Sequence, residues 1–338
     1  MKILVTGGLG FIGSHTVVEL QNKGYTVVII DNCSNSSPDV LKGIHSITGK
    51  NPIFEQFDLR EKEKVKDFFK RHHDIEGVIH FAASKAVGES VENPLLYYEN
   101  NLSTLVYILQ QLSDKRSANF IFSSSCTVYG QADELPITEN APVKAAESPY
   151  GNTKQIGEEI IRDTCKVNKN LKAISLRYFN PTGAHPSAEI GELPIGVPQN
   201  LIPFITQTAI GLREKLSVFG NDYPTPDGTC IRDYIHVVDL AQAHVVALQR
   251  LLEDKNSSNY EVFNVGTGTG STVLEVIQSF EKVSDQKLNY QIVGRREGDI
   301  TAAYADTTKA NEELGWKAKS SLDDSLSSAW KWEQKVRS

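Results

Sequence analysis

Three glycines close to the N-terminus limit the fold of this chain more than any other feature. They are Gly7, Gly10 and Gly13; the apolar segment 1–5 precedes them, and residues 14–23 have the pattern of a helix packed on a sheet. A strand, a glycine-rich turn and a helix, in this order, are typical of a dinucleotide-binding turn. Gly7 would permit the tight turn, Gly10 the close approach of a phosphate, and Gly13 close packing of the helix. The spacing is Gly-x-x-Gly-x-x-Gly, and an ordinary tight turn is the alternative.

The segment that follows the first predicted helix favours a dinucleotide-binding turn over an ordinary tight turn. Residues 25–30 are apolar and mostly β-branched, and they end at Asp31, near the interval at which an acid receives the adenosine ribose. A carboxylate there accepts hydrogen bonds from a diol and repels a 2′-phosphate, so it favours NAD over NADP. An exposed turn acid is the alternative. Further strands are expected over 52–57 and 78–83, with their carboxyl ends at the same ligand-binding edge.

The alternation of strands and helices predicts an α/β protein with a doubly wound parallel sheet of the Rossmann type. With 338 residues and 40% hydrophobic residues, the chain is long enough for one large domain or one and a half. We expect a Rossmann domain over 1–180 and a smaller α/β domain over 181–338, with part of the chain near 230–265 returning to the first domain.

Charge and residue usage exclude several classes of function. The net charge is -7 and the pI about 5.7, with no basic cluster beyond short patches such as 62–71, so no nucleic acid or membrane partner is expected. No apolar run approaches the roughly 20 residues that span a bilayer, and the start is too short for a signal peptide, so we expect a cytoplasmic protein. The histidines are scattered, and no metal is expected. The cysteines are widely spaced and fit reduced thiols: Cys33, Cys126, Cys165 and Cys230.

Chemically active side chains gather after the middle of the Rossmann segment. Residues 120–122 are expected to form a buried strand that leads into the serines 123–125, and a helix is expected over 150–167. On that helix, Tyr150 and Lys154 are at i and i+4 and therefore share a face. Lowering the phenol pKa from about 10 to neutrality requires about 4 kcal/mol of phenolate stabilisation, which a lysine and an oxidised nicotinamide could supply. An ordinary amphipathic pair is the alternative.

Through these motifs the chain resembles the extended short-chain dehydrogenase/reductases and, within them, the UDP-glucose 4-epimerases. The resemblance extends from residue 1 to about residue 332. The segments that carry the resemblance are 6–15, 31–32, 81–85, 123–130, Tyr150 with Lys154, 176–180, 219–223 and 232–236. The resemblance implies NAD-dependent inversion of C4 of a UDP-hexose through a 4-keto intermediate. It also implies that the 181–338 domain binds the UDP-sugar and that the protein is a homodimer, through the helices near 95–113 and 150–167.

The resemblance assigns roles to individual residues. Ser125, Tyr150 and Lys154 would be catalytic. The NAD-binding residues would be Gly7, Gly10, Phe11, Ile12, Gly13, Asp31, Asn32, Asp58, Leu59, Phe81, Ala82, Ala83, Lys85, Asn100, Ser123, Tyr150, Lys154 and Tyr178. The substrate-binding residues would be Lys85, Ser125, Tyr150, Phe179, Asn180, Asn200, Leu201, Ser217, Phe219, Arg232, Arg296, Asp299 and Ala303.

For three of the substrate residues, the chemistry of the side chain supports the same role. Arg232 and Arg296 carry planar guanidinium groups that bind phosphate oxygens in pairs, and Asp299 could accept from a ribose diol. A surface salt bridge is the alternative for each arginine.

Two other functions use the same fold. Nucleotide-sugar 4,6-dehydratases resemble this chain up to the active-site serine, but they carry an Asp-Glu pair where Cys126 and Thr127 stand here. A non-catalytic NAD-binding protein would not need Ser125, Tyr150 and Lys154 together. Epimerisation is therefore the preferred prediction. Because Ala303 stands where members of the resembling family that are restricted to plain hexoses have tyrosine, we expect N-acetylated UDP-hexoses as further substrates. The alternative is that Tyr304 or another side chain closes that space.

Overall fold

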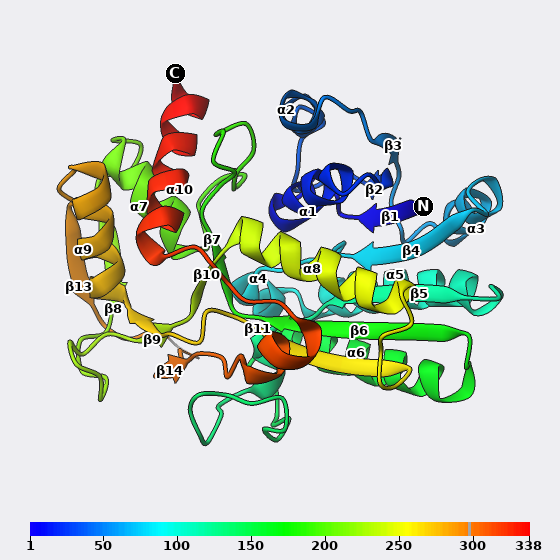
Figure 1. Cartoon of the computed structure of the whole chain (residues 1–338). Coiled ribbons are helices and arrows are strands. Elements are labelled where there is room, and N and C mark those ends of the chain that lie inside the picture. The colour runs from blue at the N-terminus through cyan, green and yellow to red at the C-terminus, as the bar shows by residue number, and fades with distance from the viewer. Residues whose placement is uncertain (297–298) are drawn as a thin grey trace.

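The computed structural model describes residues 1–296 and 299–338, and in these residues the central sheet has seven parallel strands (Figure 1). Their order is β11-β6-β5-β4-β1-β2-β3, and β1 lies between the two halves of the winding. The predicted doubly wound Rossmann-type sheet is thus confirmed. The strands are β1 (Lys2–Thr6), β2 (Thr26–Asp31), β3 (Ile53–Gln56), β4 (Ile75–His80), β5 (Ala118–Ser123), β6 (Leu171–Tyr178) and β11 (Tyr260–Val265).

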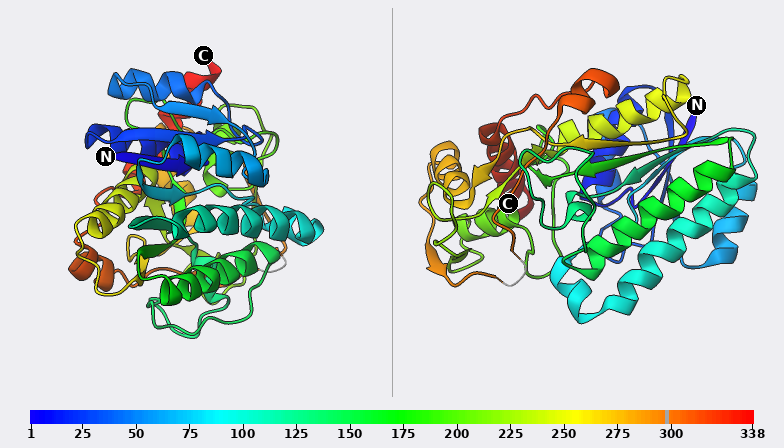
Figure 2. Two further views of the ribbon diagram at one scale, coloured as in Figure 1. Left: turned by 90° about the vertical axis from the view of Figure 1, so that its right-hand side faces the viewer. Right: turned by 90° about the horizontal axis from the view of Figure 1, so that it is seen from below.

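Helices cover both faces of this sheet (Figure 2). Successive residues of a strand point to opposite faces, so Ile3 and Val5 pack in one hydrophobic cluster with α1 and α8, while Leu4 packs in another with α3, α5 and α6. Both faces are therefore apolar, as in other parallel sheets. The helices of this part are α1 (Phe11–Asn22), α2 (Val40–Thr48), α3 (Lys62–Arg71), α4 (Val87–Glu92), α5 (Pro94–Ser113), η1 (Cys126–Tyr129), α6 (Pro149–Val167) and α8 (Val237–Leu252).

One strand differs from its prediction. The segment expected over 78–83 is β4 (Ile75–His80), so residues 81–83 lie in the loop beyond it. Two hydrogen bonds mark the end of the strand. Phe81 N donates to the carbonyl oxygen of Thr6 at 3.1 Å, and Ala82 N donates to the Thr6 hydroxyl at 3.3 Å instead of to a backbone carbonyl group. The chain thus turns against the end of β1, beside the glycine turn.

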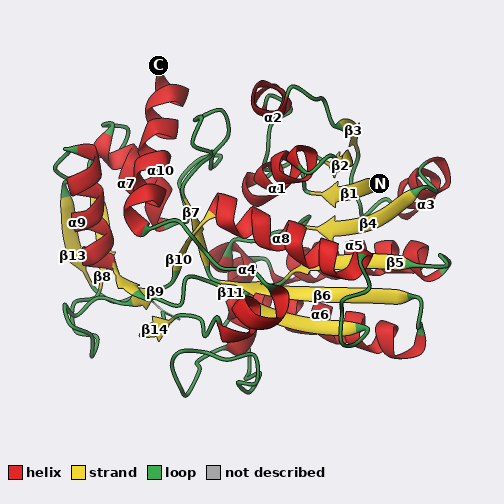
Figure 3. Cartoon of the chain, in the orientation of Figure 1, coloured by secondary structure: helices red, strands yellow, loops and turns green. Residues whose placement is uncertain are grey.

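A smaller lobe follows β6 and contains the helices at the left of Figure 3. Its hydrophobic cluster joins α7, α9 and α10 through residues such as Ile205, Phe280 and Leu326. Between β10 and β12 the chain returns to the central sheet: α8 packs against it, and β11 is one of its edge strands. The elements of the lobe are β7 (Asn180–Thr182), α7 (Leu201–Ala209), β8 (Leu216–Phe219), β9 (Ile231–Arg232), β10 (Tyr234–His236), β12 (Ser271–Thr272), α9 (Val273–Ser284), β13 (Tyr290–Val293), β14 (Ala302–Ala303) and α10 (Leu322–Arg337). The short helix η2 (Ala310–Leu314) packs against α8 and β11 instead.

Candidate active site

The glycine turn connects β1 to α1 with almost no space for side chains. Gly7 has φ +66°, and a Cβ there would lie 2.9 Å from the backbone nitrogen of Ala82. A Cβ on Gly13 would lie 2.2 Å from the carbonyl oxygen of Gly7. Glycine is therefore required at both positions, for the backbone conformation at Gly7 and for helix packing at Gly13.

The start of α1 suits an anion. Its N-cap residue is Gly10, so the helix begins without a side-chain cap, and its first turn has no acidic residue. A Cβ on Gly10 would meet only the carbonyl oxygen of Gly7, at 3.2 Å. Backbone amides and the positive end of the helix dipole are thus available to a diphosphate, with Phe11 and Ile12 in the first turn.

Asp31, at the end of β2, is buried rather than an exposed turn acid. One of its carboxylate oxygens accepts from Leu9 N at 3.1 Å, and the other accepts from Cys33 N and the Ser36 hydroxyl, both at 2.9 Å. The carboxylate therefore ties the glycine turn to the end of β2. Asp31 is 9% exposed, so part of its side chain remains accessible to a further hydrogen-bond donor.

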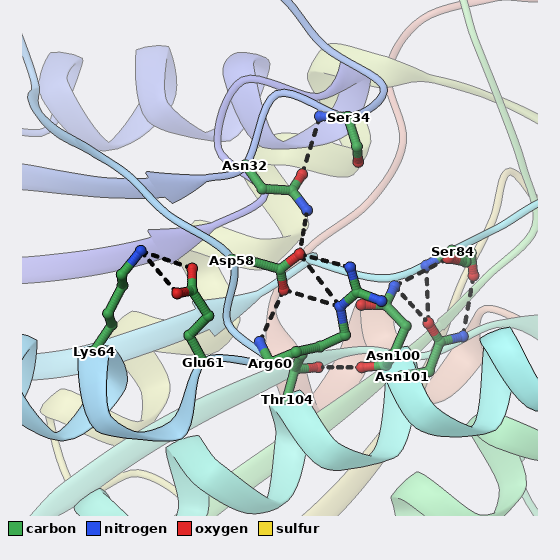
Figure 4. Close-up of polar contacts among 10 residues, drawn as sticks. All are labelled: Asn32, Ser34, Asp58, Arg60, Glu61, Lys64, Ser84, Asn100, Asn101 and Thr104. Carbon is green, nitrogen blue, oxygen red and sulfur yellow. Dashed lines mark hydrogen bonds and ion pairs between the residues drawn. The ribbon is translucent and has the colours of Figure 1, made fainter.

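A second acid lies at the neighbouring strand end (Figure 4). The amide of Asn32 donates to Asp58 at 3.1 Å, and Arg60 forms an ion pair with the same carboxylate at 2.8 Å. Hydrogen bonds from Arg60 lower the pKa of Asp58 to about 2. Leu59, the next residue, is buried. Asn32 and Asp58, predicted from widely separated motifs, are thus in direct contact.

An asparagine network joins the loop after β4 to α5 (Figure 4) and extends to the predicted catalytic helix α6. Asn100 donates to the Ser84 hydroxyl at 2.9 Å, and Asn101 accepts from Ser84 N at 2.8 Å. Asn101 also donates to the Thr153 hydroxyl, which donates to the carbonyl oxygen of Tyr150 at 2.7 Å. Sequence analysis found Asn100 and missed Asn101, because the contacts of Asn101 join segments far apart in the chain.

The predicted catalytic helix begins at Pro149, because Ser148 caps it by accepting from Gly151 N at 3.2 Å. Tyr150 and Lys154 lie on one face as expected, and both are buried. The ammonium of Lys154 donates to the carbonyl oxygen of Ser123 at 2.7 Å and lies 5.8 Å from the centre of the Tyr150 ring. Burial lowers the pKa of Lys154 to about 8.

The phenol of Tyr150 is buried among the protein's own groups. Burial, with a smaller contribution from Tyr178, raises the pKa of Tyr150 well above its usual value, and a hydrogen bond with Ser125 acts in the opposite direction. The protein's own groups therefore favour the neutral phenol, and Lys154 does not offset the loss of solvation. Ser125 itself is buried and accepts from Thr127 N at 3.2 Å.

Behind the predicted catalytic residues lies a buried ion pair that the sequence did not reveal. Arg177 of β6 donates to both carboxylate oxygens of Glu158, at 3.0 and 2.6 Å, and the Ser124 hydroxyl donates to the same carboxylate at 2.6 Å. This network fixes the serine loop to α6 and β6. The ion pair therefore positions the loop that carries Ser125.

Residues predicted for the nucleotide gather in the smaller lobe. Arg296 pairs with Asp299 at 2.6 Å, Arg232 lies 3.6 Å from the same carboxylate, and the guanidinium of Arg296 lies 5.7 Å from the centre of the Phe219 ring. Both arginines thus form an ion pair with one carboxylate, so the salt-bridge alternative stays beside the predicted diphosphate role. The Phe219 ring is 40% exposed and open to a ligand.

The side chain of Ala303 is buried, 3% exposed, in a cluster with Val128, Tyr129 and Phe179 close to the serine loop. Tyr304, the next residue, packs against Gly270 instead: a Cβ on Gly270 would lie 3.1 Å from its ring. Successive residues of an extended chain face opposite sides, so the alanine faces the serine loop.

The loop before α7 contributes a residue that sequence analysis missed. Glu192 accepts from the amide of Asn200 at 2.7 Å, and the same oxygen lies 3.6 Å from Lys85 Nζ. Glu192 is itself held by Trp332, whose indole donates to its carbonyl oxygen at 2.9 Å.

The remaining predicted residues lie at strand ends or helix starts near this edge. Phe81, Ala82 and Ala83 are in the loop after β4; Tyr178 ends β6, Phe179 lies between β6 and β7, and Asn180 begins β7; Leu201 begins α7, and Ser217 lies in β8. Among the described residues, no cluster of histidine, cysteine or acidic side chains could hold a metal ion, and no helix could cross a membrane.

Comparison with known proteins agrees with this geometry. The family model described as GDP-mannose 4,6 dehydratase matches residues 4–328. The UDP-glucose 4-epimerase of Bacillus subtilis (strain 168) is 50% identical over 333 residues, covering 98% of this chain and 97% of the relative. The chain belongs to the UDP-glucose 4-epimerase family. This family lies within the extended short-chain dehydrogenase/reductases that the sequence motifs indicated.

Solved structures of epimerases superimpose over the whole chain. The enzyme of Stenotrophomonas maltophila, with bound NAD and formylated UDP-arabinopyranose, is 46% identical with a TM-score of 0.95, covering 100% of this chain and 99% of that one. The enzyme of Bifidobacterium longum, in complex with NAD+ and UDP, is 45% identical with the same TM-score and coverage. The comparisons favour an epimerase over a dehydratase.

Proposed function

We propose that this chain is a UDP-sugar 4-epimerase that uses tightly held NAD to interconvert UDP-glucose and UDP-galactose. The observation that carries the proposal is the burial of Tyr150, Ser125 and Lys154 at one sheet edge, in a chain half identical to an epimerase. The glycine turn, the uncapped start of α1 and the carboxylate of Asp31 fit NAD. The pair of Arg232 and Arg296 fits the diphosphate of the sugar nucleotide.

The chemistry that NAD supplies when bound is reversible hydride transfer at sugar C4, by way of a 4-keto sugar. The chain's residues move the proton: Tyr150 accepts it from the 4-hydroxyl, through or beside Ser125, and returns it after the sugar has turned. Because burial raises the pKa of Tyr150, the phenolate requires positive charge from beyond the protein's own groups. An oxidised nicotinamide bound beside Tyr150 would supply such a charge, and Tyr150 would then lose its proton most readily while the cofactor is oxidised.

Inversion requires the hexose to turn over while the nucleotide stays bound. The arginine pair and Asp299 provide a firm grip on the nucleotide, while the sugar side of the site is lined by Ala303 and other small or apolar side chains. Strong binding of the part that does not react retains the 4-keto intermediate.

Incubation of the purified protein with UDP-galactose, without added NAD, tests the proposal. Separation of the products by chromatography should give UDP-glucose. A stable 4-keto-6-deoxy product would show a dehydratase instead, although Cys126 and Thr127 offer no carboxylic acid for elimination. Absence of any product, with NAD and UDP both bound, would favour a non-catalytic NAD-binding protein.

We further propose that UDP-N-acetylglucosamine and UDP-N-acetylgalactosamine are also substrates. The support is the small side chain of Ala303, with the ring of Tyr304 packed against Gly270 on the other side of the strand. An N-acetyl group at sugar C2 needs space for several more heavy atoms, which a tyrosine at 303 would fill.

The division into an NAD-binding region (1–180) and a mainly UDP-sugar-binding region (181–338), a homodimer and a cytoplasmic location are also part of the proposal. The predicted return of the chain near 230–265 to the NAD-binding region is supported by the sheet order, because β11 is an edge strand of the central sheet. For the dimer, α5 and α6 pack side by side, and Leu95 at the start of α5 is 81% exposed. Light scattering of the purified protein tests the dimer, and cell fractionation tests the location.

A further inference from the structure

One face of the C-terminal helix α10 holds a loop that leads into α7. The loop lies in the segment between β7 and α7 and is closed by an antiparallel bridge between Ala184 and Gly191. On its first arm, Ala184 N donates to the hydroxyl of Ser328 at 3.1 Å. Directly after its second arm, the carbonyl oxygen of Glu192 accepts from the indole of Trp332 at 2.9 Å. Ser328 and Trp332 are at i and i+4 of α10, so one helix face makes both contacts.

The indole ring of Trp332 also packs closely on the backbone of this loop. A Cβ on Gly191 would lie 2.5 Å from the ring, so a side chain there would push the ring and the loop apart. The helix itself is fixed in the lobe, because α10 packs against α7 and α9 (Figure 1), and Trp330 lies edge-on to Phe280 with 5.7 Å between ring centres. Trp332 therefore joins a helix anchored in the lobe to the loop before Glu192.

Glu192 extends this constraint to two predicted substrate-binding residues. One oxygen of its carboxylate accepts from the amide of Asn200 at 2.7 Å and lies 3.6 Å from the ammonium of Lys85. The side chain of Glu192 is only 11% exposed, so the carboxylate has little freedom to move independently of its backbone. The position of the Glu192 backbone therefore affects where both partners are held.

We propose that Trp332 is a positioning residue for the UDP-sugar site. By fixing the backbone of Glu192, the indole places the carboxylate that orients Asn200 and Lys85. The inference rests on the proposed function, since the UDP-sugar is the ligand predicted for those two side chains. It gives the C-terminal helix a part in substrate binding in addition to its packing in the lobe.

Trp332→Phe keeps an aromatic ring against Gly191 and removes the hydrogen-bond donor. We expect KM for UDP-galactose to rise about two- to tenfold, the range that the loss of one neutral hydrogen bond allows, with kcat within about twofold of the wild type. The Kd of UDP in calorimetric titrations should rise by a similar factor. Gly191→Ala, which pushes the loop away from the ring, should have the same effects. Trp330→Phe is the matched control: its ring packs on Phe280, so it should lower thermal stability and leave KM and Kd unchanged.

A double variant separates positioning from a general loosening of the lobe. Glu192→Ala already lacks the contacts to Asn200 and Lys85, so adding Trp332→Phe to it should leave KM unchanged. A rise in KM equal to that in the wild-type background would overturn the inference. It would also be overturned by an unchanged KM in both Trp332→Phe and Gly191→Ala, or by an equal rise in Trp330→Phe. Failure of the wild type itself to bind UDP would instead refute the proposed function.

Discussion

The ammonium of Lys85 and a carboxylate oxygen of Glu192 lie 3.6 Å apart and join the loop after β4 to the segment before α7. The same oxygen accepts from the Asn200 amide, so one acid orients two of the predicted substrate residues. The side chain of Lys85 is 52% exposed, and an ion pair of this kind contributes less than about 1 kcal/mol to the free energy of unfolding. Its main effect should therefore be on substrate binding.

We expect Glu192→Gln to lower the free energy of unfolding by less than about 1 kcal/mol and to raise KM for UDP-galactose several-fold, because the amide still accepts from Asn200 but no longer attracts Lys85. Urea unfolding and initial rates measure the two quantities. Glu189→Gln, whose partner is Lys335 on α10, is the control and should leave KM unchanged. A loss of several kcal/mol with unchanged KM would mean that Glu192 is structural.

Tyr150→Phe should lose most of its turnover while still binding NAD and UDP. The substitution removes only the proton-transfer group, and a positioned acid–base group contributes about 10²–10⁴-fold to rate. Epimerase assays, the NAD content of the purified protein and titration with UDP provide the measurements. Turnover close to that of the wild type would remove Tyr150 from its catalytic role.

Ala303→Tyr should suppress activity on the N-acetylated pair of substrates far more than on UDP-galactose. The new ring would enter the cluster of Tyr129 and Phe179, where only the alanine methyl now lies. Comparison of kcat/KM for both pairs in wild type and variant measures the effect. The hypothesis that the side chain at position 303 selects substrates by size fails if the wild type does not act on the N-acetylated pair. It also fails if the variant loses both activities equally.

Acid should destabilise the fold through three buried histidines. Burial lowers the pKa of His15 and His80 to about 3 and that of His244 to about 4, so below pH 6.5 the unfolded chain binds protons that the folded chain does not. Their stabilisation is complete above pH 6.5 and is lost as the pH falls towards 3. Between pH 6 and 5 the free energy of unfolding should fall by about 3–4 kcal/mol from these groups together.

Denaturant unfolding at a series of pH values measures this slope. His244→Phe removes one titrating group, keeps an aromatic ring against Phe81, and should reduce the slope by about 1 kcal/mol per pH unit. His73→Gln, at an exposed position, should leave it unchanged. A slope in His244→Phe equal to that of the wild type would contradict the assignment.

Sequence patterns predicted those parts of the site that local spacing determines. The order of strand, glycine turn and helix located Gly7 and Gly13, and helical periodicity placed Tyr150 and Lys154 on one face. Such features need only the geometry of one or two neighbouring elements.

The parts that were missed depend on contacts between distant segments. Glu192 meets Lys85 only after the smaller lobe has packed beside the sheet, and Asn101 reaches Thr153 only because α5 and α6 lie together. The pKa of Tyr150 is expected to fall beside Lys154 and an oxidised nicotinamide together, and among the protein's own groups burial, which spacing does not reveal, raises it. Residue pairs of this kind have no signature in a single sequence.

The hydrogen bond from Leu9 N to the carboxylate of Asp31 has a consequence for cofactor engineering. A substitution at 31 that admitted a 2′-phosphate would also remove the acceptor that holds the glycine turn against the end of β2. The turn would then lose its anchor at the place where it must present amides to the diphosphate. Conversion to NADP use therefore requires at least a second change, one that gives Leu9 N a new acceptor.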